Sequence, residues 1–262
     1  MDLSKSVLVD VDGSVAVMRL NRPAVLNALT PAVMAQLLGS TRMLSDDPTV
    51  SGLVITGEGR GFCSGADIEY QSVATHSEYR DFIQQIQELT RVIRTSDLVV
   101  VAAINGVAMG GGLELALACD RRVAAPGATM GFPEVKLGLT VTSGVNHILP
   151  RLIGPSRALD LLISGRSVSA DDALASGLVD AIESDVIGKA TEIASASGGA
   201  VAGALMRIRT ALYFGCEQSL EATLELEKAL ILESFGEAVT QDKLRGFLTR
   251  PRGVRDEESA VR

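Results

Sequence analysis

The sequence has few aromatic residues and no tryptophan. Aromatic side chains make up 3% of the 262 residues, whereas hydrophobic residues as a group make up 47%. Small aliphatic side chains must therefore fill the interior. A chain of this length can bury a large core, and it suits one domain with an appended subdomain.

Cysteine is also scarce, and no two cysteines are close in the sequence. Cys63, Cys119 and Cys216 form no CxxC pair, and such an odd, scattered count is typical of reduced thiols in the cytosol rather than of a disulfide framework. No apolar run approaches the roughly 18 residues of a membrane span, and the first residues contain no apolar signal core. We expect a soluble, cytoplasmic protein with no membrane partner.

Positive charge is limited as well, because 24 Lys and Arg stand against 32 Asp and Glu, for a net charge of −8. A general nucleic-acid binder normally presents a basic face, so we expect no nucleic-acid partner. His76 and His147 are far apart, and no set of His, Cys and acidic residues has the spacing of metal ligands. We therefore predict no metal site.

The first 145 residues alternate between β-prone and helical segments. Asp12-Gly13 is a strong hairpin signal between two β-prone runs. Expected strands cover 6–11, 15–20, 53–56, 98–104, 121–125 and 129–130, and expected helices cover 31–45, 77–95 and 113–119. Strands that alternate with helices indicate the α/β class.

From about Val145 onward, the pattern predicts one helix after another. Ser169-Ala170-Asp171-Asp172 is a capping signature, and Gly177 is a stop signal for that short helix. A longer helix is expected over 217–235. The last ten residues are charged, and we expect them to be frayed.

Two glutamates stand in unusual settings. Glu114 follows the glycine run 110–112 that opens a predicted helix, and Glu134 ends a short apolar stretch. Burial disfavours the charged form, so we expect a raised pKa for such carboxyls, and a pair of this kind can accept and donate protons near neutral pH. Glycines at a helix start let backbone N–H groups point at a ligand, although a tight turn under close packing explains them equally well.

A dinucleotide site is the first rival interpretation of the glycine run. Gly106, Gly110 and Gly112 match a GxxxGxG spacing, which normally follows the first strand of a nucleotide-binding unit. Here the spacing lies deep in the chain, and no YxxxK accompanies it. We reject this interpretation.

A cysteine nucleophile is the second rival. Gly61-x-Cys63-x-Gly65 imitates a nucleophile elbow, which places its nucleophile directly after a strand. Six residues separate Cys63 from the expected strand end at Thr56, and neither histidine shows any sign of lying near it. Cys63 is better interpreted as a small packed thiol.

Six stretches, in their order along the chain, resemble the enoyl-CoA hydratase/isomerase (crotonase) family. They are 21–29 (NRPAVLNAL), 61–68 (GFCSGADI), 105–114 (NGVAMGGGLE), 132–134 (FPE), 149–154 (LPRLIG) and 173–179 (ALASGLV). The likeness extends over about residues 6–250. Each stretch alone is moderate evidence, but six in register make a specific match.

The resemblance implies a fold and a substrate. It implies an α/β spiral of β-β-α turns over 1–195 that carries the site for a coenzyme A thioester. A helical region over 196–262 would then assemble homotrimers, often paired into hexamers. Coenzyme A would be part of the substrate, so no separate cofactor is expected.

The resemblance also assigns roles to individual residues. The backbone N–H groups of Ala66 and Gly111 would form an oxyanion hole for the thioester oxygen, beside Gly110. The residues implied to line the bent pantetheine and adenine are Ala66, Asp67 and Ile68 together with Val25 and Leu26. The implied phosphate contacts are Arg22 and a C-terminal basic cluster of Lys243, Arg245, Arg250 and Arg252, the cluster from a neighbouring subunit.

Family membership does not fix the reaction, because the shared chemistry is only enolate stabilisation. Family hydratases carry glutamates at both positions, whereas isomerases commonly keep only the second. Glu114 and Glu134 therefore favour a lyase of fatty acid metabolism that reversibly adds water across the 2,3 double bond of an enoyl-CoA. An isomerase that uses Glu134 alone is one alternative, and a non-catalytic RNA-binding relative is another, which the net charge of −8 disfavours.

Two departures from the family pattern bear on the substrate. Segment 138–144 (GLTVTSG) lacks the proline and paired glycines common in fatty-acid hydratases. That loop helps to shape the acyl pocket, so a substrate other than a simple straight-chain enoyl group is compatible with the sequence. Glu69 stands where relatives often carry a lysine, which weakens one expected coenzyme contact.

Overall fold

The computed structural model describes residues 5–196, 203–215 and 218–249. The chain forms two compact units, Met1–Gly199 and Ala200–Arg262. All described strands belong to the first unit, and the described part of the second unit is helical. None of the helices in the described ranges is long and apolar enough to cross a membrane.

The larger sheet of the first unit has six strands in the order β1-β2-β3-β5-β7-β10. β1 and β2 form the expected antiparallel hairpin, and the other neighbours are parallel. The strands are β1 (Val7–Asp12), β2 (Val15–Leu20), β3 (Gly52–Gly57), β5 (Val99–Ile104), β7 (Arg121–Ala124) and β10 (Ala181–Ile182). β3 is buried along its whole length, as expected of a parallel strand covered on both faces.

A second, smaller sheet contains four short strands in the order β4-β6-β8-β9. They are β4 (Gly61–Cys63), β6 (Val107–Met109), β8 (Thr129–Gly131) and β9 (Ser167–Ser169). A strand of the larger sheet is followed by one of the smaller sheet and then by a helical segment, three times in succession: β3-β4-α2, β5-β6-α4 and β7-β8-η2. This is the expected spiral of β-β-α turns.

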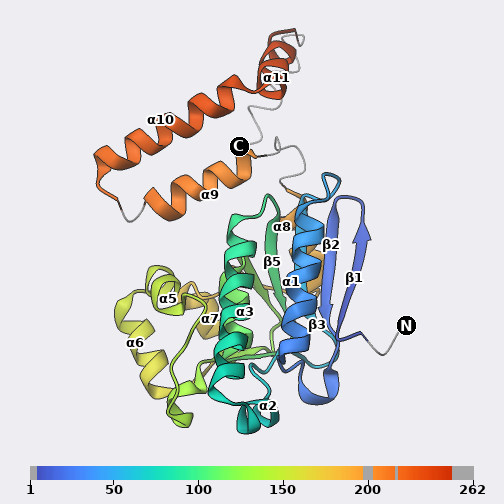
Figure 1. The fold of residues 1–262 in the computed structure, drawn as a ribbon, viewed down its shortest axis with the longest axis vertical. Coiled ribbons are helices and arrows are strands. Elements are labelled where there is room, and N and C mark those ends of the chain that lie inside the picture. Colours follow the sequence, from blue (N-terminus) through green and yellow to red (C-terminus); the bar gives the residue numbers. More distant parts are fainter. Residues whose placement is uncertain (1–4, 197–202, 216–217, 250–262) are drawn as a thin grey trace. The chain divides into compact units, whose positions relative to one another are not determined.

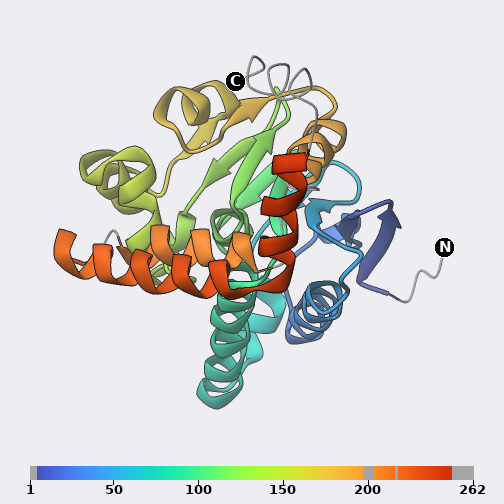
Figure 2. The same cartoon turned by 90° about the horizontal axis from the view of Figure 1, so that it is seen from above.

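Helices cover the larger sheet on both faces (Figures 1 and 2). The helical segments of this unit are η1 (Pro23–Val25), α1 (Pro31–Ser45), α2 (Ile68–Val73), α3 (His76–Thr95), α4 (Gly111–Ala118), η2 (Pro133–Leu137), α5 (Val145–Ile153), α6 (Pro155–Ser164), α7 (Ala170–Ser176) and α8 (Val186–Ser195). α1 and α3 lie side by side and bury Leu37, Phe82 and Leu89 in the main core. α8 covers the opposite face, where its Ala190 and Ala194 pack against β3 and β5.

Capping side chains fix the starts of several helices. Thr30 accepts a hydrogen bond from the backbone of α1 and precedes a proline at the first helical position. Thr75 and Glu78 form a reciprocal capping box at the start of α3. Ser169 caps α7, and Gly177 ends it in the left-handed conformation, as the sequence predicts.

The expectation of uninterrupted helices after Val145 is wrong, because two short strands lie in that region. β9 pairs with β8, and β10 pairs with β7. At three and two residues, they are too short to show a period-two pattern. They form strands because they lie beside strands of the two sheets. At β9, for example, a Cβ placed on Gly131 of β8 would lie 2.7 Å from the Arg166 carbonyl oxygen.

The second unit contains α9 (Ala204–Gly215), α10 (Leu220–Gly236) and α11 (Ala238–Thr249). Arg207 of α9 forms ion pairs with Glu233 of α10, at 3.3 Å, and with Glu237 just beyond it. The large apolar side chains of this unit that are exposed include Met206, Ile208, Leu212, Leu220, Leu224, Ile231, Leu232, Phe235, Val239, Leu244 and Phe247. The expected trimer assembly by this region stays a prediction, and the charged tail of 253–262 lies outside the described residues.

Candidate active site

Two loops meet at one edge of the smaller sheet. β4 and β6 are parallel neighbours, so the segments that leave their carboxyl ends lie close together. The loop after β4 bridges to Leu29, whose N–H donates to the Gly65 carbonyl and whose carbonyl accepts from the Asp67 N–H, both at 2.8 Å. Backbone groups alternate in direction along an extended segment, so the intervening Ala66 N–H points away from Leu29.

Glycines allow these two loops to approach. Gly65 has a φ of +97°, and a Cβ there would lie 2.8 Å from the Met109 carbonyl oxygen. A Cβ on Gly112 would lie only 2.2 Å from the Cys63 carbonyl oxygen. At Gly112, close packing alone therefore requires glycine. For this residue of the glycine run, packing explains the glycine without any ligand.

Gly111 differs, because a Cβ there would meet its neighbours at ordinary contact distances. That Cβ would lie 3.5 Å from Leu29 Cδ1 and 3.7 Å from the Ala66 backbone nitrogen, which makes the Gly111 and Ala66 backbones neighbours. Within the described ranges, neither the Ala66 N–H nor the Gly111 N–H donates a hydrogen bond, whereas the Gly110 N–H donates to Gly131 at 2.9 Å. Gly111 is also the first residue of α4, where the helix dipole favours negative charge.

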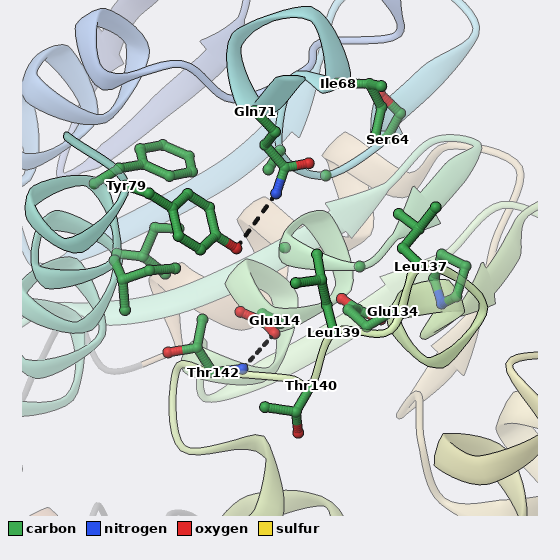
Figure 3. Close-up of a pocket in the computed structure, with 18 residues that line it drawn as sticks. Ser64, Ile68, Gln71, Tyr79, Glu114, Glu134, Leu137, Leu139, Thr140 and Thr142 are labelled. Carbon is green, nitrogen blue, oxygen red and sulfur yellow. Dashed lines mark hydrogen bonds between the residues drawn. The ribbon is translucent and has the colours of Figure 1, made fainter. Parts of the chain in front are cut away.

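Glu114 lies on the first turn of α4 and is 2% exposed. Its Oε1 accepts a hydrogen bond from the Thr142 N–H at 2.7 Å (Figure 3). Its Oε2 accepts one from the Ser143 hydroxyl at 2.9 Å. Burial raises the pKa of Glu114 to about 7, although these two hydrogen bonds lower it, and the nearby Glu134 carboxyl adds to the rise. The group can therefore exchange a proton near neutral pH.

Glu134 lies in η2 and is half-buried. Its carboxyl lies against Gly110, where an added Cβ would be 2.9 Å from Oε1. Its Oε2 is buried and has no hydrogen-bond partner in the described part of the chain. Burial raises the pKa of Glu134. A buried polar atom without a partner in the protein points to a place for substrate or water.

Glu114, Glu134, Ala66 and Gly111 line one cavity with an empty volume of about 580 Å³, its open mouth included. Figure 3 shows the two glutamates in this cavity. The predicted site residues among its lining are Ala66, Ile68, Gly110, Gly111, Glu114 and Glu134. α3 contributes Tyr79, Phe82, Ile83 and Ile86, and the segment around and after η2 contributes Pro133, Leu137, Leu139, Thr140 and Thr142. Ser64, Gly65 and Gln71 complete the lining.

Other predicted substrate contacts lie outside this cavity lining. The Arg22 guanidinium donates to the Ala28 carbonyl at 2.7 Å and to Asp67 at 2.9 Å, so its charge faces a carboxylate of the same unit. Val25 is exposed, and Leu26 packs near Gly61. Their contacts with coenzyme A stay predictions. Lys243 and Arg245 are exposed on α11, and Arg250 and Arg252 lie outside the described residues.

Sequence reasoning missed several residues at this site, among them the polar residues Tyr79, Gln71 and Ser143. Tyr79 shares the helical spacing of Phe82, Ile83 and Ile86, so periodicity along α3 could have placed it in the cavity wall. Gln71 carried no comparable signal. Ser143 lies in segment 138–144, which the resemblance places at the acyl pocket, but no local pattern indicated its hydrogen bond to Glu114.

The structure supports the rejection of Cys63 as a nucleophile. Cys63 is fully buried, and its thiol contacts the Asn27 carbonyl at 3.2 Å. Burial raises the pKa of this thiol to about 12, which opposes thiolate formation. His76 and His147 are both exposed. The described residues contain no group of three His, Cys, Asp or Glu that could hold a metal ion.

Comparisons with known proteins identify relatives of this chain. The family model described as enoyl-CoA hydratase/isomerase matches residues 10–252. A crotonyl-CoA hydratase of Syntrophomonas wolfei is 38% identical over 179 residues, which cover 68% of this chain and 69% of that protein. A probable enoyl-CoA hydratase of Mycobacterium tuberculosis is 35% identical over 247 residues, 93% of each.

Solved structures show the same architecture. The crystal structure of an enoyl-CoA hydratase from Bacillus anthracis has a TM-score of 0.86 and 30% identity, covering 93% of this chain and 96% of that one. The chain is thus an enzyme with the crotonase fold, and it belongs to the enoyl-CoA hydratase/isomerase family. The predicted family and fold class are confirmed.

Proposed function

We propose that the protein is an enoyl-CoA hydratase that adds water reversibly across the 2,3 double bond of an enoyl-CoA thioester. One observation carries the proposal: two glutamates with raised pKa values line the same cavity as Ala66 and Gly111, whose backbones are neighbours and whose N–H groups donate to no described residue. The relatives named above as hydratases support the same reaction. The acyl thioester would enter the cavity with its coenzyme A portion outside.

In this proposal, the Ala66 and Gly111 N–H groups hold the thioester oxygen. Attack of water at Cβ moves negative charge onto that oxygen, and fixed donors stabilise the charge as it develops. A single donor of this kind lowers the barrier by about 3–4 kcal/mol in comparable enzymes. The start of α4 adds positive potential at the same point.

The two glutamates divide the proton transfers. Ionised Glu114 takes a proton from the water whose oxygen bonds to Cβ, while protonated Glu134 delivers a proton to Cα. The elements of one water molecule are thereby added, and the two carboxyls exchange protonation states. The hydrogen bonds from Thr142 and Ser143 favour the ionised form of Glu114, and the lack of such donors on Glu134 Oε2 favours its protonated form.

An isomerase is the second candidate, and one observation favours it. Both oxygens of Glu114 are engaged by the 142–143 loop, whereas Glu134 lines the same cavity and its Oε2 has no partner in the described ranges. Glu134 could then move a proton from one carbon to another unaided. Product mass separates the two reactions, because hydration adds one water and isomerisation adds nothing.

The remaining expectations belong to the same proposal. We place the enzyme in fatty acid metabolism in the cytoplasm, and we expect it to assemble as a homotrimer or a hexamer through α9–α11. The exposed apolar side chains on these helices support self-association.

Replacement of each glutamate tests the proposal. Glu114→Gln and Glu134→Gln should each slow hydration of an enoyl-CoA ester by about 10²–10⁴-fold, the usual contribution of a general acid or base. Binding of a saturated acyl-CoA should persist, because glutamine preserves the cavity shape. The matched control is Glu192→Gln on α8, where the carboxyl is exposed. Near-normal hydration by both cavity variants would refute the two-glutamate mechanism.

A further inference from the structure

A polar pair interrupts the otherwise largely apolar wall of the cavity. Gln71 of α2 and Tyr79 of α3 both border the cavity, and the Gln71 amide nitrogen donates to the Tyr79 hydroxyl at 3.3 Å (Figure 3). Both side chains are half-buried. Their neighbours on α3 are Phe82, Ile83 and Ile86. The pair therefore places polar atoms in a part of the cavity wall that is otherwise formed by apolar side chains.

This pair keeps hydrogen-bonding capacity in reserve. Because the Tyr79 oxygen accepts from Gln71, its hydroxyl proton is left to donate elsewhere, and Gln71 keeps its carbonyl oxygen as an acceptor. Within the described ranges, neither group has another partner. The nearby Tyr70 differs, because its hydroxyl donates to the Glu78 carbonyl at 3.1 Å and does not border the cavity.

The charges around the cavity restrict what this pair can bind. Its described lining contains Glu114 and Glu134 but no lysine or arginine. An ionised carboxylate on the acyl group would meet two acids and no cation, which is unfavourable in a partly desolvated site. A neutral oxygen can use the Tyr79 donor and the Gln71 acceptor without that repulsion.

We propose that Gln71 and Tyr79 form a subsite for a neutral, hydrogen-bonding oxygen, such as a hydroxyl, carried by the acyl group beyond its reacting double bond. The subsite rests on the proposed function, since it names the acyl class that the hydratase prefers. A purely hydrocarbon chain in the cavity covers the pair without satisfying it. An oxygen on the chain restores about one net hydrogen bond, which corresponds to roughly a tenfold preference.

The test compares matched enoyl-CoA esters. One ester carries a hydrocarbon chain, a series of analogues carries a single hydroxyl at successive carbons beyond the double bond, and one analogue ends in a carboxylate. For the wild type, kcat/KM should be about tenfold higher for the best hydroxylated ester than for the hydrocarbon ester, and lowest for the carboxylate. Tyr79→Phe should bring the hydroxyl-to-hydrocarbon ratio close to one, and Gln71→Met should lower it.

Tyr70→Phe is the matched control, because it removes a phenolic oxygen outside the cavity and should leave the ratio as in the wild type. If Tyr79→Phe slows both esters equally, Tyr79 merely packs and the subsite is refuted. A wild type without preference at any hydroxyl position refutes it too. Unchanged melting temperatures would show that the variants fold.

A binding comparison separates the subsite from the reaction. The matching saturated acyl-CoA esters need no turnover, so their Kd values can be measured by calorimetry for the wild type and for Tyr79→Phe. Tighter binding of the hydroxylated ester that Tyr79→Phe abolishes would support the subsite even if no ester were hydrated, in which case only the proposed function would fail. Equal Kd values for both esters would refute the subsite.

Discussion

Glu114 and Glu134 are the same chemical group in opposite surroundings. Glu114 is almost fully buried, and each of its oxygens accepts a hydrogen bond from the 142–143 loop. Glu134 is half-buried, and one of its oxygens has no partner in the described ranges. Donors stabilise a carboxylate, and their absence favours the protonated acid. The proposed mechanism uses this difference to assign the base to Glu114 and the acid to Glu134.

The largest expected effect is on the exchange of Cα hydrogens, which should separate the role of Glu134 from that of Glu114. If Glu134 alone serves Cα, Glu114→Gln should keep exchange of a Cα hydrogen of an acyl-CoA with heavy water, whereas Glu134→Gln should lose about 10²–10⁴-fold of that exchange. Mass spectrometry of the recovered ester measures the deuterium. Equal loss of exchange in both variants would show that the two carboxyls act as one unit.

A smaller but still large effect is expected from Gly110→Ala. The added Cβ would lie 2.9 Å from Glu134 Oε1, so it would displace that carboxyl while leaving the contacts of Glu114 in place. A shift of about 1 Å in a catalytic group can cost about 10²-fold in rate. We expect a loss of that order in kcat for hydration.

Gly13→Ala is the control for Gly110→Ala. Gly13 has a φ of +58°, close to the +53° of Gly110, but an added Cβ would meet nothing within 4 Å. It therefore places a side chain at a positive φ without touching a carboxyl. Equal loss of hydration in both variants would mean that strain, and not the displacement of Glu134, causes the effect.

The smallest expected effect concerns the hydroxyl that holds Glu114. Ser143→Gly removes the donor on Oε2, and glycine adopts the local φ of +53° without strain. Loss of a donor to the carboxylate should raise the pKa of Glu114 above about 7. The base is then ionised only at higher pH, so hydration should fall several-fold about one pH unit below neutrality and recover above it.

The dependence of the hydration rate on pH tests the predicted rise in the pKa of Glu114. The acid limb of kcat should move to higher pH in Ser143→Gly and also in Ser143→Ala, which lacks the hydroxyl but keeps the strained backbone. An acid limb that stays in place in both variants would mean that the Thr142 N–H alone sets the ionisation of Glu114. A shift in Ser143→Gly alone would assign the effect to the relaxed backbone.

Sequence patterns predicted most strands of the larger sheet, the longer helices of the first unit and the two glutamates, but not the short strands β4 and β6 or the helix α2. Glu114 and Glu134 stood out because acids beside glycine or apolar runs are unusual, and the hairpin and capping residues located the first strands and several helices. The local pattern could not reveal contacts between distant segments. The Ser143 hydrogen bond to Glu114 joins residues 29 apart, and the ion pair of Arg22 with Asp67 joins residues 45 apart. The short strands β9 and β10 escaped prediction for the same reason.

The contact between Gly112 and Cys63 has a practical consequence. The packing that brings the Ala66 and Gly111 backbones together also seals the Cys63 thiol, which is fully buried. The thiolate attacks an alkylating reagent, so this fully buried sulfur can react only when the structure around it opens. In a variant that keeps Cys63 as its sole cysteine, the rate of alkylation would therefore report how often the structure opens beside the Ala66 and Gly111 backbones.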